Sequence, residues 1–407
     1  MNTNFIFSTM NKTAYPIILF CLSTVIVNAQ KEVRNFIFGH SLINHEFQLN
    51  ITPSQETSVP HWLASLARAA DHQYVVSGQY GFLPQHANLP PIAQWGFDSV
   101  DGAWDSDNED FSAADFNTIM ITPGNFIQWQ SPNEDYPTDP ISPVEATNTI
   151  FEWCNSKESN LDFFIYENWP DMAPYLSNGF PPSAEEWSEY NIFLNNNFHN
   201  WFIDYYSQVA KEFSNNCVSF IPAGTLISNL LQTAPYDEIP ISELYEDDAP
   251  HGRATIYFLS SLVTYMSIYE EAAPAGYLVD EIIHPLIREN YSDVVNLFWA
   301  ELNNLNEDSN LTIFCKEPIS SSNSSSLLDY KINITPNPTT SRVTISGETP
   351  NHIVLIYDIL GRKVKPSYEL NHQTLELDFS DLGNGTYIII GKDNKGKLLY
   401  SKRIIKI

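Results

Sequence analysis

The sequence contains little positive charge. Its 407 residues include 20 lysines and arginines against 49 aspartates and glutamates. Residues 331–407 hold 11 of the basic and 7 of the acidic residues, and Lys12 lies near the N-terminus. This leaves 8 basic and 42 acidic residues in 31–330, a net charge of −34 there. Because phosphate backbones are bound by clusters of lysine and arginine, this composition argues against a nucleic acid as partner.

Cysteine is also scarce. Apart from Cys21, the chain has Cys154, Cys217 and Cys315, and their spacing fits no metal-binding motif. In an oxidising compartment one pair could form a disulfide and leave one thiol, but the sequence does not say which. The acidic run 98–110 lacks the glycine of an EF-hand loop and is interpreted as a solvated loop. We therefore predict no metal and no cofactor.

Long apolar runs are absent beyond residues 17–27, which lie near the N-terminus and are followed by Asn28-Ala29. This pattern is typical of a secretory signal peptide over 1–29, and its short length and closeness to the terminus argue against a membrane anchor. A lipoprotein anchor at Cys21 is less favoured because small residues do not precede it. The sequence predicts an exported, soluble mature protein without an integral membrane segment.

The serine-rich stretch 320–326 predicts a flexible linker over 319–330. Beyond it, short alternating segments are separated by Gly361, Gly383 and Gly385. Strands are expected at 342–345, 353–357, 375–379, 386–390 and 398–407. This pattern predicts a small all-β sandwich over 331–407.

Residues 30–318 alternate between strand-like and helix-like stretches. After a first strand ending near Gly39, strands are expected at 74–77, 118–121, 162–166 and 218–221. Helices are expected at 59–70, 144–156, 190–213 and 225–232, and from about residue 251. This alternation predicts an α/β domain in which a parallel sheet is covered by helices on both faces.

Two short segments could carry chemistry. The first strand ends in Gly39-His40-Ser41-Leu42, and ligands bind beyond the carboxyl ends of parallel strands. The segment Asp248-Ala-Pro-His251 could supply a base and a carboxylate partner from a single loop. Each pattern alone also fits an ordinary structure: Gly-x-Ser is common in turns, and Asp-x-x-His could begin a helix with Asp248 near its N-cap.

Taken together and in order, these segments resemble the SGNH hydrolases, also called GDSL-like esterases. The matching segments over most of 33–272 are Gly39-His-Ser-Leu42, Gly78-Gln-Tyr-Gly81, Thr122-Pro-Gly-Asn125 and Asp248-Ala-Pro-His251. The chain departs from the family pattern at His40, where an acidic residue is usual, and at Phe126, where aspartate is common. The resemblance implies a flavodoxin-like three-layer fold for the SGNH-like hydrolase domain over 30–318.

The same resemblance assigns roles. It implies Ser41 as nucleophile, His251 as general base and Asp248 as the residue that orients His251. It also implies an oxyanion hole built from the Ser41 N–H, the Gly81 N–H and the Asn125 amide.

Residues 331–407 resemble the C-terminal sorting domain of the type IX secretion system of Bacteroidetes. The matching segments are Thr335-Pro-Asn-Pro338, Tyr357-Asp-Ile-Leu-Gly-Arg362, Leu382-Gly-Asn-Gly-Thr-Tyr387 and the basic end Lys402–Lys406. The resemblance implies export by the type IX machinery and cleavage of this domain, with the body released or attached to the cell surface. A carbohydrate-binding β-module is the less favoured alternative, because these strands show no aromatic platform.

Aromatic residues follow the predicted strand ends. Tyr80, Trp129 and Trp169 are predicted to contact substrate, because exposed aromatic rings suit the apolar faces of sugars. We therefore expect a secreted serine esterase that removes ester substituents, acetyl groups foremost, from polysaccharides. Two alternatives remain open at this point: a lipid or aryl esterase on the same scaffold, and a noncatalytic surface glycan-binding protein.

Overall fold

A computed structural model describes residues 30–45, 58–97, 99–307, 311–315 and 333–406. The last range excludes 347–351, 359–362, 366, 372–373 and 394–397. The predicted leader 1–29 and linker 319–330 lie outside the described residues, so these domain limits stay predictions.

The larger domain is built on one parallel sheet. Its strands are β1 (Glu32–Gly39), β2 (Gln73–Tyr80), β3 (Thr118–Ile121), β4 (Asp162–Tyr166) and β5 (Cys217–Ile221). Their order is β2-β1-β3-β4-β5, and every neighbouring pair is parallel. This is the flavodoxin-like order, in which β2 is added on one side of β1 and the later strands on the other. The reversal between β1 and β3 opens a crevice at the carboxyl edge of the sheet. The predicted fold class is confirmed.

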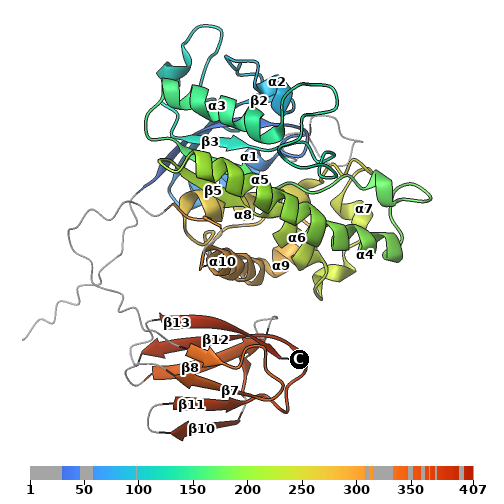
Figure 1. Ribbon diagram of the computed structural model, residues 1–407, viewed down its shortest axis with the longest axis vertical. Coiled ribbons are helices and arrows are strands. Elements are labelled where there is room, and N and C mark those ends of the chain that lie inside the picture. Colours follow the sequence, from blue (N-terminus) through green and yellow to red (C-terminus); the bar gives the residue numbers. More distant parts are fainter. Residues whose placement is uncertain are drawn as a thin grey trace, which may run out of the picture.

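Helices cover both faces of the sheet (Figure 1). On one side, α1 (Val59–Ala69) packs against α8 (Ala254–Tyr269), which also contacts α6 (Ala223–Leu231) and α10 (Tyr291–Glu307). On the other side, α3 (Pro143–Lys157) packs against α5 (His199–Glu212). The remaining helices are α2 (Leu83–His86), α4 (Ala184–Phe193), α7 (Ile241–Leu244) and α9 (Pro285–Glu289).

Local sequence signals explain where several helices begin. The Ser58 hydroxyl accepts a hydrogen bond from the His61 N–H at 3.1 Å and caps α1, while Ser142 caps α3 in the same way. Ser183 and Glu186 form a capping box at the start of α4. The helix expected at 190–213 is instead interrupted, because a π-helical turn (Leu194–Phe198) joins α4 to α5.

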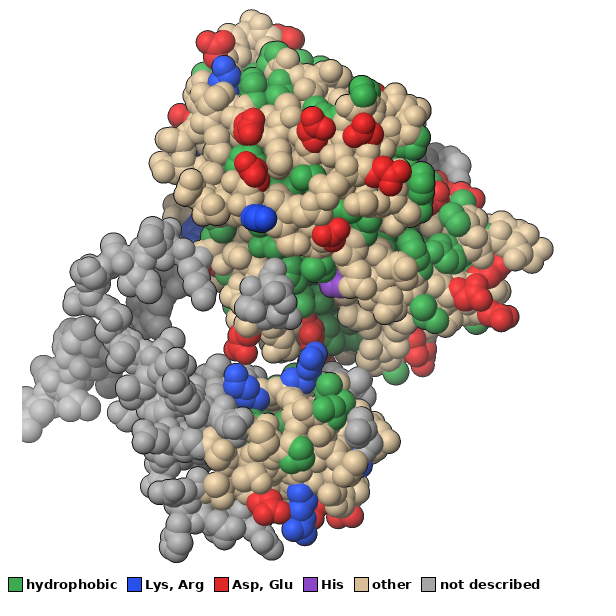
Figure 2. Space-filling view, viewed as in Figure 1, with side chains coloured by type: hydrophobic (Ala, Val, Ile, Leu, Met, Phe, Trp, Pro, Cys, Tyr) green, Lys and Arg blue, Asp and Glu red, His purple; other side chains and the backbone are tan. Residues whose placement is uncertain are grey.

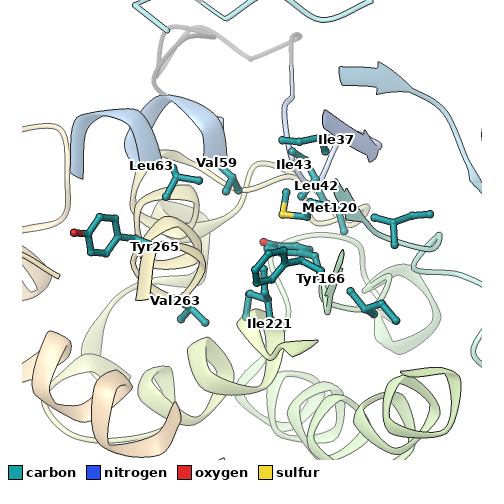
Figure 3. Packing of buried hydrophobic residues seen from close by; sticks show 14 of the residues in the cluster. Ile37, Leu42, Ile43, Val59, Leu63, Met120, Tyr166, Ile221, Val263 and Tyr265 are labelled. Atoms are coloured by element: carbon teal, nitrogen blue, oxygen red, sulfur yellow. The ribbon is translucent and has the colours of Figure 1, made fainter. Parts of the chain in front are cut away.

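The core lies directly beneath the turn that follows β1. Leu42 and Ile43 are fully buried, and they sit near Val59, Met120 and Tyr166 (Figure 3). Burying an aliphatic side chain of this size contributes about 1.5–3 kcal/mol to folding. Ser41 is therefore followed immediately by two residues whose burial fixes the turn.

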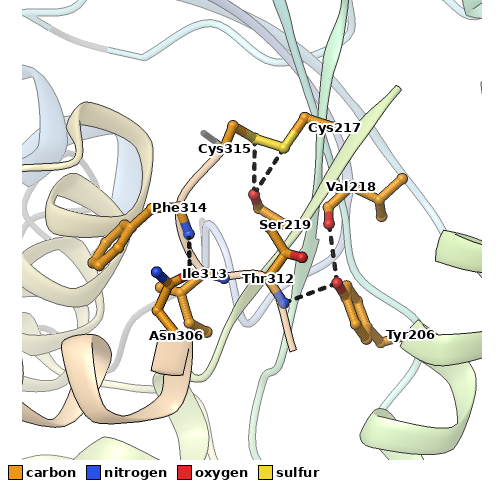
Figure 4. The surroundings of a disulfide bond; sticks show 9 residues. All are labelled: Tyr206, Cys217, Val218, Ser219, Asn306, Thr312, Ile313, Phe314 and Cys315. Atoms are coloured by element: carbon orange, nitrogen blue, oxygen red, sulfur yellow. Dashed lines mark hydrogen bonds between the residues drawn. A yellow bond between two sulfur atoms is a disulfide. The ribbon is translucent and has the colours of Figure 1, made fainter. Parts of the chain in front are cut away.

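A disulfide closes the β5 edge of the sheet. Cys217 and Cys315 are joined, and Cys154 is the buried free thiol, so one of the pairings left open by the sequence is found. The Thr312 carbonyl accepts from the Phe220 N–H at 2.8 Å, and the Thr312 N–H donates to the Tyr206 hydroxyl at 3.0 Å (Figure 4). Segment 311–315 thus covers an edge strand that would otherwise expose unpaired backbone groups.

The smaller domain is an antiparallel β-sandwich. One sheet has the order β10-β11-β7-β6 and the other β13-β12-β8-β9. The strands are β6 (Asn333–Thr335), β7 (Arg342–Ser346), β8 (His352–Asp358), β9 (Lys363–Val364), β10 (Ser367–Asn371), β11 (Thr374–Asp378), β12 (Gly385–Asp393) and β13 (Leu398–Lys406). Val343, Phe379 and Ile389 lie at its core. This agrees with the predicted all-β class.

Charge separates the two domains. Figure 2 shows mainly aspartates and glutamates among the charged side chains on this face of the larger domain, and a mixture of basic and acidic side chains on the smaller one. Among the helices that the structure describes, none has the length and apolarity needed to cross a bilayer.

Candidate active site

The turn after β1 presents Ser41 at the carboxyl edge of the sheet. The Ile43 N–H donates to the His40 carbonyl at 2.9 Å, which closes the turn around Ser41. The hydroxyl of Tyr257, buried on α8, donates to the Ser41 carbonyl at 2.8 Å. The backbone of Ser41 is therefore held from both sides, while its side chain stays partly accessible.

His251 reaches Ser41 from a hairpin between α7 and α8. The Glu246 N–H donates to the His251 carbonyl and the Arg253 N–H to the Leu244 carbonyl, both at 2.8 Å, which pairs the two arms of the hairpin. His251 Nε2 lies 3.0 Å from Ser41 Oγ, and the His251 side chain is 16% exposed. The structure thus brings together the two residues that were predicted as nucleophile and base.

The carboxylate beside His251 belongs to Asp247, which corrects the prediction of Asp248. Asp247 Oδ2 lies 2.7 Å from His251 Nδ1, and Asp247 Oδ1 accepts from the His251 N–H at 3.1 Å. The Asp248 side chain is exposed, and its carbonyl accepts from the Met172 N–H at 2.9 Å. The hairpin wraps the 247 carboxylate back onto residue 251 and turns the next side chain outward.

The contact with Asp247 determines which nitrogen of the His251 ring carries the proton. Partial burial opposes ionisation of Asp247, but hydrogen bonds from His251 outweigh it and hold the Asp247 pKa below its usual value. An ionised carboxylate only accepts hydrogen bonds, so His251 Nδ1 carries the proton. In neutral His251, Nε2 is then the acceptor that faces the Ser41 hydroxyl.

His45 forms a second contact with His251 that sequence reasoning missed. The two rings stack with centroids 3.7 Å apart and planes inclined by 12°. Behind them, the buried carboxylate of Glu246 lies 3.5 Å from His45 Nε2 and 3.6 Å from Arg253 Nη1. No sequence signal connects His45 to His251, because the chain brings them together only through the sheet and the hairpin.

The three predicted oxyanion donors differ in whether they already form a hydrogen bond. The Gly81 N–H donates to the Gly39 carbonyl at 2.9 Å, which extends the ladder between β1 and β2, so its predicted role as an oxyanion donor is corrected. Gly81 has a φ of 155°, which side-chain-bearing residues rarely adopt, and this accounts for glycine there. Among the described residues, none accepts from the Ser41 N–H and none bonds to the Asn125 side-chain amide, and the oxyanion roles of these two groups stay predictions.

His40 is buried beneath the turn. Its Nδ1 lies 3.4 Å from the Leu42 N–H, and its Nε2 donates to the Pro123 carbonyl at 3.2 Å. Burial lowers the pKa of His40 to about 4. A neutral imidazole therefore occupies the position where the resembling family usually has an acidic residue, and it links the β1 turn to the segment that carries Asn125.

Two of the three predicted aromatic contacts are exposed. Trp129 is 71% and Tyr80 46% exposed, whereas Trp169 is only 1% exposed. The Trp169 indole N–H donates to the Pro250 carbonyl at 2.8 Å, one residue before His251. The prediction of Trp169 as a substrate platform is therefore wrong: this side chain supports the hairpin from inside the core.

The neighbouring backbone explains why Trp169 is buried. The Gly224 N–H donates to the Glu167 carbonyl at 3.0 Å, and a Cβ at Gly224 would lie 2.0 Å from the Asn168 carbonyl oxygen. The buried Glu167 carboxylate also accepts from the Thr225 N–H at 3.2 Å and lies 2.6 Å from His199 Nδ1. These contacts pin the segment after β4 against the start of α6.

Residues 333–406 match the family model of the secretion system C-terminal sorting domain. This confirms the predicted resemblance, and it means that the chain carries a sorting domain of the type IX secretion system, which implies export to the cell surface or beyond. No curated protein matches the chain.

Several solved structures are similar to the chain. A DUF4886 family protein from Bacteroides uniformis is 12% identical, with 69% of this chain and 96% of that chain covered and a TM-score of 0.43. A protein from Parabacteroides merdae described as a GDSL-like lipase is 13% identical, with 59% and 96% covered and a TM-score of 0.35. A catalytic mutant of an acetylxylan esterase from Geobacillus stearothermophilus is 11% identical, with 63% and 96% covered and a TM-score of 0.35.

Proposed function

We propose that the protein is a secreted serine esterase that hydrolyses ester substituents on polysaccharides, acetyl groups foremost. One observation carries this proposal: Ser41 Oγ, His251 and Asp247 form a continuous hydrogen-bonded chain, with 3.0 Å from Ser41 Oγ to His251 Nε2 and 2.7 Å from His251 Nδ1 to Asp247 Oδ2. A hydroxyl is a weak nucleophile, and a base oriented by a carboxylate is what activates it.

The reaction follows from these contacts. His251 Nε2 takes the Ser41 proton as Oγ attacks the ester carbonyl, and Asp247 stabilises the imidazolium that forms. The Ser41 N–H and the Asn125 amide donate to the developing oxyanion. His251 then protonates the leaving alcohol, and a water molecule activated by the same imidazole hydrolyses the acyl-enzyme. Each proton moves between Ser41, His251 and the substrate or water, so no metal is required for this route.

The surface supports a carbohydrate as the alcohol component. Tyr80 is the exposed last residue of β2, and Trp129 is exposed on the loop that follows β3, so both lie at the carboxyl edge of the sheet. Aromatic faces of this kind suit the C–H faces of sugar rings. The sorting domain at 333–406 would direct export of the esterase, which would then have access to extracellular polysaccharides.

The test compares the wild-type chain with Ser41→Ala. Acetylated, feruloylated and methyl-esterified glycans are supplied separately, and the released acid or alcohol is identified by chromatography. We expect acetate release by the wild type and a loss of at least about a thousandfold in Ser41→Ala, with an unchanged circular dichroism spectrum. Ester hydrolysis that persists in folded Ser41→Ala would contradict the proposal.

A fluorophosphonate probe and the preferred acyl-chain length together separate the remaining candidates. The proposed esterase forms a covalent adduct at Ser41, and the adduct is absent from Ser41→Ala. A noncatalytic glycan-binding protein would bind glycans but take up no probe. An esterase for lipids would instead prefer long acyl chains over acetylated sugars.

A further inference from the structure

An open pocket lies between α2 and the segment that follows Asn125. Its volume is about 210 Å³, and Phe82, Phe126, Tyr136 and Asp139 are among the residues that line it. Pockets that enclose drug-sized ligands measure roughly 300–1,000 Å³. The space is therefore suited to a single ring and not to an extended acyl chain.

Ring contacts connect this pocket to the candidate active site. The Phe82 ring lies 5.4 Å from the ring of His40, which precedes Ser41, and 5.0 Å from the Phe126 ring, measured between centroids. Phe126 directly follows Asn125, which is proposed as an oxyanion donor. The two phenylalanine rings touch edge to face, so a ligand would pack against both of them and not between them. Such a group would lie on the side of the Ser41 turn that carries Asn125.

The lining combines apolar rings with a carboxylate. Phe126 is 47% exposed, so its ring is open to a ligand, and the Thr138 hydroxyl donates to Asp139 Oδ2 at 2.8 Å. Aromatic faces pack on the C–H faces of a sugar, and a carboxylate accepts hydrogen bonds from its hydroxyl groups. An anionic ring would be repelled by Asp139 and by the net charge of −34 over 31–330.

We propose that the pocket lined by Phe82, Phe126 and Asp139 is a subsite for a neutral sugar ring of the esterified glycan. This inference rests on the proposed function and deepens it, because it names uncharged glycans as the substrate class. Phe82 and Phe126 would hold the ring, and Asp139 would discriminate against uronic acids through charge repulsion.

Binding tests this subsite without relying on catalysis. Titration calorimetry of the full chain carrying Ser41→Ala, with an unacetylated neutral xylo-oligosaccharide, is expected to give saturable binding. Adding Phe126→Ala should weaken this binding about tenfold, as expected for loss of one aromatic contact. Leu278→Ala is the matched control, because Leu278 is an exposed apolar residue outside the pocket and its removal should change nothing. Equal binding by the Phe126→Ala protein and its parent would overturn the inference.

Charge reversal tests the preference for uncharged rings. In the chain with intact Ser41, Asp139→Lys should raise kcat/KM for an acetylated glycan rich in uronic acid relative to a neutral acetylated glycan, by about three- to tenfold at low salt. An unchanged ratio would overturn the neutral-sugar assignment. A preference for feruloyl esters that is lost with Phe126→Ala would overturn it too, because the pocket would then hold the acyl group. These outcomes would leave the esterase proposal standing. A wild-type protein that hydrolyses no ester would instead refute the esterase proposal, while the binding measured by calorimetry would still test the subsite.

Discussion

The two halves of the candidate active site are built in different ways. Ser41 stands at the end of a buried strand, followed by Leu42 and Ile43 in the core, and its turn rests on the buried His40. His251 stands on a hairpin, and the side chain of Asp247, the hairpin carboxylate that contacts His251, is 40% exposed. The strand half is positioned by the sheet and the core. The hairpin half is positioned by backbone hydrogen bonds between its own arms and by single side-chain contacts such as that of Trp169 with the Pro250 carbonyl. Substitutions of neighbouring hairpin residues should therefore differ clearly in their effect on activity.

Substitutions of the neighbouring hairpin residues Asp247 and Asp248 should give the largest difference in kcat. Asp247→Asn keeps the shape but removes the charge that stabilises protonated His251, and we expect kcat to fall about 10²- to 10⁴-fold. Asp248→Asn should change kcat less than about twofold, because the Asp248 side chain is exposed and does not contact His251. Steady-state kinetics on an acetylated glycan measures both. A larger loss in Asp248→Asn would show that the hairpin adopts another register during catalysis.

Substitution of His45, which contacts the hairpin half of the site, should lower kcat/KM by a smaller factor. His45→Ala removes the ring stacked on His251, and an aromatic pair contributes about 0.5–1.5 kcal/mol, so kcat/KM should fall roughly two- to twelvefold. His45→Phe keeps a stacking ring but loses the contact with Glu246, and it should recover part of this loss. A pH–rate profile of each variant reports any shift in the titration of His251. Identical losses in the Ala and Phe variants would mean that stacking contributes nothing.

Acid stability probes the strand half. The pKa of His40 is lowered to about 4 by burial, whereas an unfolded histidine titrates near 6.5, so the unfolded state binds more protons between these values. The unfolding free energy of the larger domain should therefore decrease as the pH falls from about 6.5 to about 4, with His40 contributing up to about 3 kcal/mol.

The measurement is urea unfolding at several pH values, with His40→Gln as the comparison. The unfolding free energy of this variant should depend less steeply on pH. Some dependence should remain, because burial also lowers the pKa of His86 to about 4. A pH dependence that is unaltered by His40→Gln would mean that His40 is accessible to protons in the folded state.

Regular elements were the most predictable part of the molecule. The strands at 118–121 and 162–166 have the predicted limits, because continuous apolar runs of that length indicate buried parallel strands. The order of these strands then places Ser41 and Asn125 at one edge of the sheet. The pairing of Ser41 with His251 was implied by the resemblance to the SGNH hydrolases.

Predictions failed where a role depended on which way one group points. Gly81 was expected to present a free N–H, yet the ladder between β1 and β2 continues one residue further and uses that donor. Trp169 was expected on the surface, yet the close approach of Gly224 to Asn168 fixes the segment so that the indole faces the core. Neither contact leaves a mark in the local sequence.

The sequence by itself indicated the α/β class and the β-sandwich, because both follow from the periodicity of apolar residues, which is a local property. Resemblance to known families added the sorting domain and the pairing of Ser41 with His251. Only the tertiary structure decided that Asp247 and not Asp248 contacts His251, that His45 stacks on it, and that Cys217 pairs with Cys315. Side-chain directions in irregular loops are set by contacts between distant segments, and those contacts exist only once the chain has folded.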